Sequence, residues 1–301
     1  MRLKPILAAA LAPFALLAAC ATPADALAED VRPADAAPAP ALWRLGDADT
    51  TIYLFGTVHV LPDGVDWYDA RIAAAFNASD ELVTEVDVSD QAAMAGYVAS
   101  AAALDDPRGL RGLMSEQSRS RYDTALTGLG LPVEAFDSYQ PWFAALNLSV
   151  LPLLQAGYNP AAGVEMALAA RAGGKARTHL ETIEEQISIF AGLERDYQLT
   201  YLDLTVDGID NVVPMIDEMV AVWLEGDAEK LATIMNSEMT DDYLYNRLLV
   251  QRNSNWVNWI ENRLEQPGTV FIAVGAGHLA GPGSVQDQLQ TRGHRVVRIW
   301  K

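Results

Sequence analysis

Apolar residues follow two different patterns along the chain. Near both ends, short apolar runs are bounded by Gly, Asp or Asn, as is typical of strands. These runs predict strands at Leu42–Leu45, Thr51–Phe55, Glu81–Val88, Ala176–Glu181, Thr269–Val274 and Arg295–Trp300. The turn Gly46-Asp47-Ala48-Asp49 between the first two predicts a hairpin.

The middle of the chain has mainly helical spacing of its apolar residues. The predicted helices cover about 66–78, 90–103, 115–127, 141–157, 161–172, 183–264 and 282–292, with breaks in the longest near Gly208, Pro214 and Gly226-Asp227. The apolar segment 141–157 is too short and too interrupted to span a membrane, so we expect a buried helix. Strands at both ends with helices between them predict an α/β fold: a mixed central sheet built from N- and C-terminal segments, with a helical insert.

One motif occurs twice. The apolar runs at 52–55 and 270–274 are each followed by Gly-x-x-His, which ends at His59 in the first copy and at His278 in the second. The repetition predicts two quasi-equivalent halves whose strand ends meet. Ligands of open α/β sheets bind at the carboxyl ends of strands, and histidine serves there as a metal ligand or a general base. A single histidine of this kind is more often structural, so the prediction of a shared site depends on the pair.

Glu85 is the natural third member of such a site. Strand alternation places Val83, Glu85 and Asp87 on one face, and a carboxylate in an apolar strand is costly unless it is paired or binds a cation. An exposed edge strand is the alternative. Two histidines and a carboxylate would suit Zn²⁺, Mn²⁺, Co²⁺ or Fe²⁺ and could activate water for hydrolysis.

Three further charged residues are candidates for substrate binding or for support of the site. Arg252 lies on the apolar stripe of a predicted helix and needs an anionic partner there, unless it extends to solvent. Glu165 begins a helix, where it could simply interact with the helix dipole. Glu181 ends a strand, where it could instead cap the next helix. His179 and His294 are expected to be structural and on the surface, respectively.

Composition excludes several classes of protein. The 301 residues contain 21 Lys and Arg against 40 Asp and Glu, a net charge of −19, so we expect no nucleic-acid partner. The single cysteine, Cys20, rules out an internal disulfide or a cysteine metal site. No Gly-x-Ser-x-Gly elbow or P-loop supports a serine hydrolase or an NTPase.

The first 19 residues have the form of a signal peptide. Arg2 and Lys4 precede an apolar run that ends in Leu17-Ala18-Ala19-Cys20, which resembles the lipobox of bacterial lipoproteins. We therefore expect a lipid anchor on Cys20, a flexible linker over 20–41 and a folded domain over 42–301. Ala21 after the cysteine resembles the sorting pattern for the outer membrane. Cleavage after Ala26-Leu27-Ala28 is the alternative, and it would leave a soluble periplasmic protein.

Several segments together resemble the TraB/PrgY/GumN family, whose relatives include the Tiki metalloproteases. The segments are Phe55–His59, Gly163-Val164-Glu165, Leu180–Gln186, Arg252-Asn253 and Val274–Leu279, in the expected order. The resemblance covers about residue 42 to the C-terminus. It maps the family's histidines onto His59 and His278 and its acidic residue onto Glu85. It implies an α/β fold and, from Tiki proteins, a protease that depends on Mn²⁺ or Co²⁺. The Wnt substrates of the animal proteins do not transfer to a chain with a bacterial export signal.

The leading hypothesis is a metal-dependent hydrolase of the cell envelope, most simply a peptidase. His59, His278 and Glu85 would hold the metal, and Glu165, Glu181 and Arg252 would support the site or bind substrate. Two alternatives remain. One is a non-catalytic protein that binds a peptide, a polysaccharide or haem, as related ChaN-type proteins bind haem. The other is a metal-free hydrolase that uses His and Glu as bases, as erythromycin esterases are thought to do.

Overall fold

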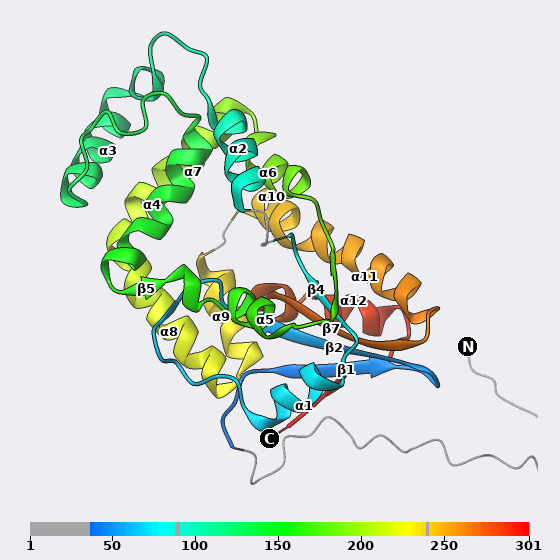
Figure 1. The fold of residues 1–301 in the computed structure, drawn as a ribbon. Helices are drawn as coiled ribbons and strands as arrows, with labels where there is room; N and C mark the ends of the chain where they lie inside the picture. The colour runs from blue at the N-terminus through cyan, green and yellow to red at the C-terminus, as the bar shows by residue number, and fades with distance from the viewer. Residues whose placement is uncertain (1–36, 88–90, 239–240, 301) are drawn as a thin grey trace, which may run out of the picture. The chain divides into compact units, whose positions relative to one another are not determined.

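A six-stranded mixed sheet forms the centre of the fold (Figure 1). The computed structural model describes residues 37–87, 91–238 and 241–300. The strands, in their spatial order across the sheet, are β6 (Ala176–His179), β4 (Glu81–Thr84), β7 (Gly268–Gly275), β2 (Thr50–Thr57), β1 (Leu42–Gly46) and β8 (Val297–Arg298). The strands β6, β4, β7 and β2 run parallel, whereas β1 is antiparallel to both of its neighbours. The predicted α/β fold with a mixed sheet is confirmed.

The two strands that carry the Gly-x-x-His motifs are direct neighbours. β2 and β7 pair in parallel from Thr50↔Gly268 to Thr57↔Gly275, although more than 200 residues separate them in the chain. The predicted hairpin of β1 and β2 is also present, and its turn is held by the Asp47 carboxylate, which accepts hydrogen bonds from the backbone of Asp49 and Thr50. The N- and C-terminal segments therefore build one sheet, as predicted.

The helices fill the chain between the strands. Their bounds are α1 (Ala70–Ala78), α2 (Gln91–Ala102), α3 (Glu116–Gly128), α4 (Pro141–Gln155), α5 (Val164–Arg171), α6 (Ile183–Ala191), α7 (Arg195–Gly208), α8 (Val212–Glu225), α9 (Ala228–Glu238), α10 (Asp242–Tyr245), α11 (Gln251–Leu264) and α12 (Val285–Thr291). Short 3₁₀ turns are η1 (Leu110–Leu113), η2 (Pro160–Ala162), η3 (Ile209–Asn211) and η5 (Ala276–Leu279), and η4 (Asn246–Val250) is a π-helical turn. A small second sheet pairs β3 (Leu61–Pro62) with β5 (Tyr158–Asn159).

The predicted helical stretch 183–264 is divided more often than its sequence indicates. Breaks occur at Gly208 and Gly226 as predicted, but Pro214 lies in the first turn of α8, where a missing N–H group costs no hydrogen bond. Gly226 adopts φ +73° against the carbonyl of Ala39, a close approach that a side chain would block. A further break after Gly192 separates α6 from α7. These breaks let the insert fold back on itself.

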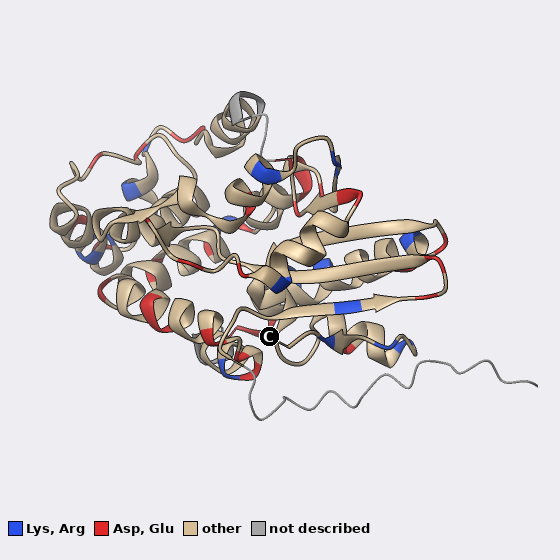
Figure 2. Ribbon diagram, turned by 60° about the horizontal axis from the view of Figure 1, so that its bottom comes forward, with Lys and Arg blue, Asp and Glu red and all other residues tan. Residues whose placement is uncertain are grey.

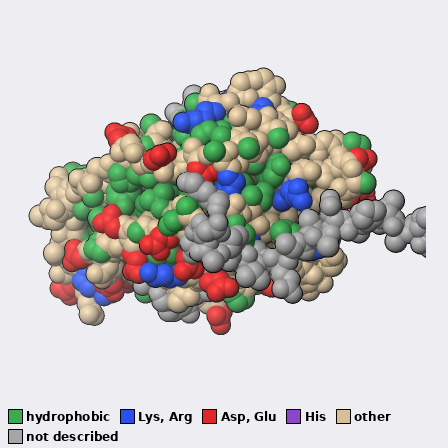
Figure 3. Space-filling model, turned by 90° about the horizontal axis from the view of Figure 1, so that it is seen from below, with side chains coloured by type: hydrophobic (Ala, Val, Ile, Leu, Met, Phe, Trp, Pro, Cys, Tyr) green, Lys and Arg blue, Asp and Glu red, His purple; other side chains and the backbone are tan. Residues whose placement is uncertain are grey.

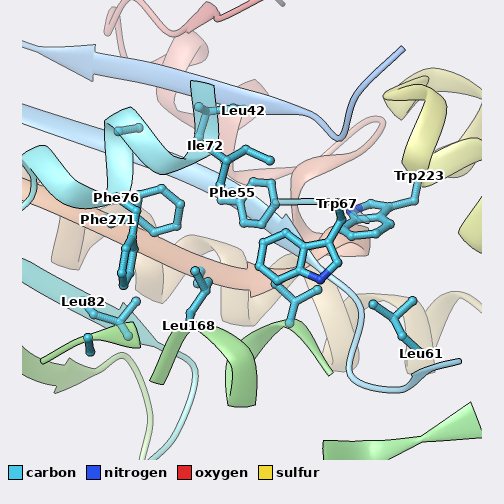
Figure 4. Close-up of a cluster of buried hydrophobic side chains, with 14 of the residues drawn as sticks. Leu42, Phe55, Leu61, Trp67, Ile72, Phe76, Leu82, Leu168, Trp223 and Phe271 are labelled. Atoms are coloured by element: carbon cyan, nitrogen blue, oxygen red, sulfur yellow. The ribbon is translucent and has the colours of Figure 1, made fainter. Parts of the chain in front are cut away.

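Each face of the sheet is covered by a separate apolar core. Because side chains alternate along a strand, Phe271 and Ala273 of β7 face one core, and Val270, Ile272 and Val274 face the other. The first core is aromatic, with Phe55, Trp67, Phe76, Phe271 and Trp223 packed together beneath α1 (Figure 4). The second core packs the sheet against α11 and α12 through Trp256, Ile260 and Leu289. The sheet is thus held rigidly on both sides.

The insert has an apolar cluster of its own. Tyr122 and Leu126 of α3, Leu148 of α4 and Leu202 of α7 pack together away from the sheet. The segment 141–157 is buried on one side of α4, whereas Val150 and Leu154 are 37% and 40% exposed. In the part of the chain that the structure describes, no helix is long and apolar enough to cross a membrane.

Residues just before the predicted domain boundary at residue 42 pack against the fold. Ala39 and Ala41 are buried, and the carbonyl of Pro40 accepts a hydrogen bond from Arg71. The predicted signal peptide, Cys20 and the first part of the predicted linker lie outside the described residues. Asp and Glu residues are distributed along the described elements with fewer Lys and Arg between them (Figure 2), and the face seen in Figure 3 carries patches of hydrophobic side chains among the charged ones.

Candidate functional site

Four strand ends bring the predicted site residues to one edge of the sheet. Because β2, β7, β4 and β6 run parallel, their carboxyl ends lie side by side. His59 follows β2, His278 follows β7, Glu85 follows β4 and Glu181 follows β6. Glu85 therefore lies beyond the end of a central strand, not within an edge strand as the alternative had it.

Gly275 lies at the centre of this edge. Its N–H group donates a 2.7 Å hydrogen bond to Glu85 Oε1. A Cβ atom on Gly275 would lie 3.2 Å from Glu85 Oε1, 3.5 Å from His59 Nε2 and 3.7 Å from His278 Cδ2. Two atoms that each lie within 4 Å of one point are less than 8 Å apart, so the separation of the two histidine rings does not exclude a shared ligand. The glycine leaves the space between them open.

His59 reaches the surface of the site from a contact with the buried Glu165. Helix α5 begins beside the end of β2, where the Val164 N–H group donates to the Val58 carbonyl. This contact places Glu165 2.7 Å from His59 Nδ1, and the Thr57 hydroxyl donates a short hydrogen bond to the same carboxylate oxygen. Glu165 is buried, whereas the His59 side chain is 66% exposed.

The charge of Glu165 controls the protonation of His59. The attraction of this carboxylate outweighs desolvation and raises the pKa of His59 to about 9. Water screens part of the attraction because the ring is largely exposed. With Nδ1–H donated to Glu165, the Nε2 edge faces the space beside Gly275. The position of Glu165 in the first turn of α5 is thus explained by His59 and not by the helix dipole alone.

Arg252 is the centre of the buried part of the site. Its five N–H groups all have acceptors: Nε and Nη2 donate to Glu181, Nη2 also to Glu85 at 2.6 Å, and Nη1 to the Leu248 carbonyl and to His278 Nε2 at 2.9 Å. The side chain is only 12% exposed and lies over the ring of Trp256. Arg252 therefore does not extend to solvent, and no donor remains for a substrate in this state.

A π-helical turn precedes Arg252 and sets its direction. The turn η4, between α10 and α11, is wider than an α-helical turn by about one residue. It therefore rotates the residues of α11 about the helix axis relative to an uninterrupted α-helix. Such turns are frequent at functional sites. The sequence alone does not reveal this turn, because residues 246–250 have ordinary helical composition.

Glu181 pairs with Arg252 and does not cap the next helix. Its two oxygens accept from Arg252 at 2.8 and 2.9 Å, and Trp256 Nε1 donates to it at 3.0 Å. The capping box of α6 is made instead by Thr182 and Glu185. Glu185 therefore takes the capping role expected of Glu181, and the Glu181 carboxylate is available to pair with Arg252.

His278 is held as a neutral imidazole with a defined tautomer. Arg252 can only donate, so His278 Nε2 accepts, and Nδ1–H therefore donates to Asn253 Oδ1 at 2.6 Å. The orientation of the Asn253 amide is fixed because its Nδ2 donates to the Gly283 carbonyl. Burial lowers the pKa of His278 to about 3, so the ring is uncharged at neutral pH.

Glu85 is ionised although it is buried. Desolvation raises the pKa of Glu85. The neighbouring His278, Arg252 and His59 and the Gly275 N–H group lower it by more than this, so that the pKa is about 2. Because His278 is neutral at neutral pH, Arg252 and the Gly275 N–H group stabilise the carboxylate there. Gln186 Nε2 also donates to Glu85 at 3.1 Å.

Sequence reasoning did not identify Asn253, Gln186 or Trp256 as parts of the site, although Gly275 was part of the second Gly-x-x-His motif. Asn253 and Gln186 lie in segments that carry the family resemblance, and this was the only sequence signal for them.

The two remaining histidines contact partners outside the site. His179 Nδ1 lies 3.0 Å from the Thr84 hydroxyl, and His294 Nε2 lies 3.0 Å from Glu261.

The side chains that could bind a metal ion are only partly available to it. His59 Nε2 and Glu85 Oε1 face the same space, but His278 Nε2 is engaged by Arg252. Over residues 37–87, 91–238 and 241–300, no group of three or more His, Cys, Asp or Glu side chains has an arrangement that would hold a metal ion. The predicted site of His59, His278 and Glu85 thus stays a prediction.

The fold and the site define a class: an α/β protein with a histidine- and glutamate-rich polar centre at the carboxyl edge of its parallel strands. The model of the TraB/PrgY/gumN family matches residues 41–298, and the chain belongs to this family. The chain is 24% identical to the uncharacterized protein YbaP of Escherichia coli (strain K12) over 240 residues, which are 79% of this chain and 87% of that protein. YbaP of Shigella flexneri gives the same values. An uncharacterized protein of Treponema pallidum (strain Nichols) is 20% identical over 272 residues, 83% of this chain and 80% of its own. No solved structure matches.

Proposed function

We propose that the protein is a metal-dependent hydrolase that cleaves peptide bonds in the bacterial cell envelope. The observation that carries the proposal is the convergence of His59, Glu85 and His278 around Gly275 at the carboxyl edge of the sheet. Each is a side chain that binds divalent cations, and Mn²⁺, Co²⁺ and Zn²⁺ accept nitrogen and oxygen ligands of this kind.

The protonation of Glu85 and His278 favours a cation at this place, whereas His59, whose pKa is raised to about 9, must first lose a proton. Glu85 is a carboxylate, and His278 is neutral with Nδ1–H donated to Asn253, which leaves its lone pair on Nε2. The Glu165–His59 pair resembles the carboxylate–histidine pairs that orient metal ligands, with Nε2 turned to the open space. His59 and Glu85 would hold the ion, and His278 would join them when Arg252 releases its Nε2. A bound ion would supply a water of lowered pKa for hydrolysis.

The chain's own residues then have distinct tasks. Thr57 and Glu165 fix the His59 ring and hold its Nδ1 proton. Arg252 keeps Glu85 and Glu181 ionised inside the protein and, with Asn253, fixes His278. Because Arg252 has no free donor, we assign it a positioning role and not direct contact with substrate.

The proposal is tested by peptide hydrolysis with and without added Mn²⁺, Co²⁺ or Zn²⁺, together with calorimetric titration of each metal. We expect activity that depends on metal, and affinity that rises with pH because His59 must lose its proton to bind. His59→Ala should remove both. His294→Ala, which changes a histidine outside the site, should keep both. Absence of both binding and cleavage in the wild type would sink the proposal.

One observation favours a metal-free hydrolase as the second candidate. Arg252 occupies the Nε2 lone pair of His278, while His59 and Glu165 form a histidine–carboxylate pair that can act as a general base without an ion. This candidate predicts hydrolysis that persists in excess chelator. It also predicts a rate that rises with pH as His59 loses its proton.

We also propose that the protein is anchored by a lipid on Cys20, at the periplasmic face of the outer membrane. The proposal is supported by Leu17-Ala18-Ala19-Cys20 after an apolar run. Labelling of cells with a radioactive or clickable fatty acid should mark the wild type and not Cys20→Ser. Equal labelling of the two, or release of the wild type with the soluble periplasmic fraction, would contradict it.

A further inference from the structure

An apolar groove crosses the helical insert beside the candidate site. It encloses about 430 Å³ between α4, α7, α8, α9 and the α10–η4 segment. Leu204, Met215, Met219, Met235 and Leu248 are among its lining residues, and Leu204 is 57% exposed. Flexible methionine side chains suit a surface that adapts to varied apolar partners. The function proposed above does not use this groove.

One end of the groove reaches the second Gly-x-x-His motif. A Cβ atom on Gly277 would lie 2.2 Å from Met235 Cε, so the methionine packs directly on the backbone that carries His278. On the same side, Leu248 lines the groove, and its carbonyl accepts a hydrogen bond from Arg252. A chain lying in the groove would therefore lead toward the cluster of Glu85, Arg252 and His278.

The charge around the groove selects a cationic occupant. Residues 196–245, which supply most of its walls, contain twelve Asp and Glu residues and a single Lys or Arg, Lys230, and Arg121 of α3 pairs with only two of the twelve, Asp203 and Asp207. Asp241 lines the groove itself, and the exposed Asp210 stands between two further lining residues, Ile209 and Asn211. An apolar floor with an acidic rim attracts a segment that carries both apolar and basic side chains, and it repels anionic ones.

We propose that this groove binds an apolar, cationic segment of the peptide substrate and directs the adjoining peptide bond to the His59–Glu85 edge. The delivery of the peptide bond to the His59–Glu85 edge rests on the proposed function, whereas binding in the groove does not. Binding in the groove depends on Met215, Met219 and the acidic rim, and it does not require His59. A failure of catalysis can therefore be distinguished from a failure of binding.

The test is the fluorescence anisotropy of a labelled peptide of alternating Leu and Lys with the purified protein, beside a matched peptide of Leu and Glu. We expect saturable binding of the Leu/Lys peptide that weakens with salt, and none of the Leu/Glu peptide. Met215→Lys should weaken binding at least about tenfold, which is about 1.4 kcal/mol. Val150→Lys, an equal change at an exposed residue of α4 outside the groove, should leave binding unchanged.

His59→Ala separates the two proposals. If this variant still binds the Leu/Lys peptide, the result supports binding in the groove. If the wild type binds the peptide but never cleaves it, the proposed hydrolysis is wrong and the proposal of binding in the groove is unaffected. Three results would overturn the groove: no binding of the Leu/Lys peptide by the wild type, equal binding by Met215→Lys, or equal binding of the Leu/Glu peptide. Tighter binding to neutral phosphatidylcholine vesicles than to the peptide would also overturn it, in favour of a lipid surface.

Discussion

The site contains two histidine–carboxylate groups that differ in almost every physical respect. His278 is buried with Glu85, Arg252 and Asn253, and each polar group there has a partner. His59 is 66% exposed, and its Nε2 edge faces open space, although Glu165 holds the other nitrogen. The same residue types therefore give a neutral ring with a pKa of about 3 in one place and a ring with a pKa of about 9 in the other.

Burial and charge account for the difference. At His278 the desolvation cost of a second cation beside Arg252 exceeds the attraction of Glu85, whereas at His59 the attraction of Glu165 exceeds desolvation. A buried, fully bonded cluster positions groups, and a partly exposed one is available for chemistry. The comparison indicates that the first region holds its groups, the proposed ligands Glu85 and His278 among them, in fixed positions, and that His59 is the group most accessible to a substrate or an ion.

The largest effect is expected from Arg252→Met. The change leaves Glu85 and Glu181 buried without their cation, so we expect a loss of about 3–5 kcal/mol in the free energy of unfolding. Urea denaturation measures it. Arg121→Met, at an exposed pair with Asp203 and Asp207, is the control and should cost about 1 kcal/mol or less. Equal losses in the two variants would contradict the assignment of Arg252.

Acid should lower the free energy of unfolding because folded His278 cannot take up a proton. In the unfolded chain a histidine takes up a proton near pH 6.5, whereas folded His278 resists it to about pH 3, so stability falls as the pH drops below 6.5. His278→Gln can keep both hydrogen bonds without titrating, and it should flatten the slope between pH 6.5 and 4.5. Below pH 4.5 the loss from Glu85, whose pKa is lowered to about 2, should remain. Unfolding free energies measured across this range decide the matter; an unchanged slope in the variant would refute it.

Glu165→Gln should change His59 without unfolding the protein. Loss of the carboxylate charge lowers the pKa of His59 from about 9 toward its ordinary value near 6.5. The wild-type pair stabilises the fold fully below pH 6.5, and this contribution disappears as the pH rises toward 9. NMR titration of the His59 ring measures the shift. A His59 pKa equal to that of the wild type would show that Glu165 does not control it.

The smallest effect on stability is expected from His59→Gln. Because the side chain is largely exposed and its ring is mostly neutral above pH 9, the unfolding free energy measured above pH 9 should change by about 0.5 kcal/mol or less, while the proposed hydrolysis falls at least about 100-fold. Thermal denaturation and peptide hydrolysis of the same preparation measure the two effects. A large loss of stability would remove the distinction between the two regions.

The sequence by itself determined much of the architecture. Apolar runs bounded by turn residues predicted the strands, the hairpin and the mixed sheet, because side-chain period and turn chemistry are local properties. The repeated Gly-x-x-His motif also predicted that the strand ends before His59 and His278 meet, and β2 and β7 are direct parallel neighbours. The divisions near Gly192 and at the π-helical turn were not predictable, because they depend on the packing of the insert.

Only the tertiary structure decided which charges are partners. Glu181, Arg252 and Glu85 come from three distant segments, and nothing local indicates that one guanidinium joins two carboxylates and a histidine. Glu181 was a possible cap in the sequence, but in the fold Thr182 and Glu185 form the capping box and Glu181 pairs with Arg252. The sequence thus supplied the residue types, and their protonation was set by burial and by neighbours that only the folded chain brings together.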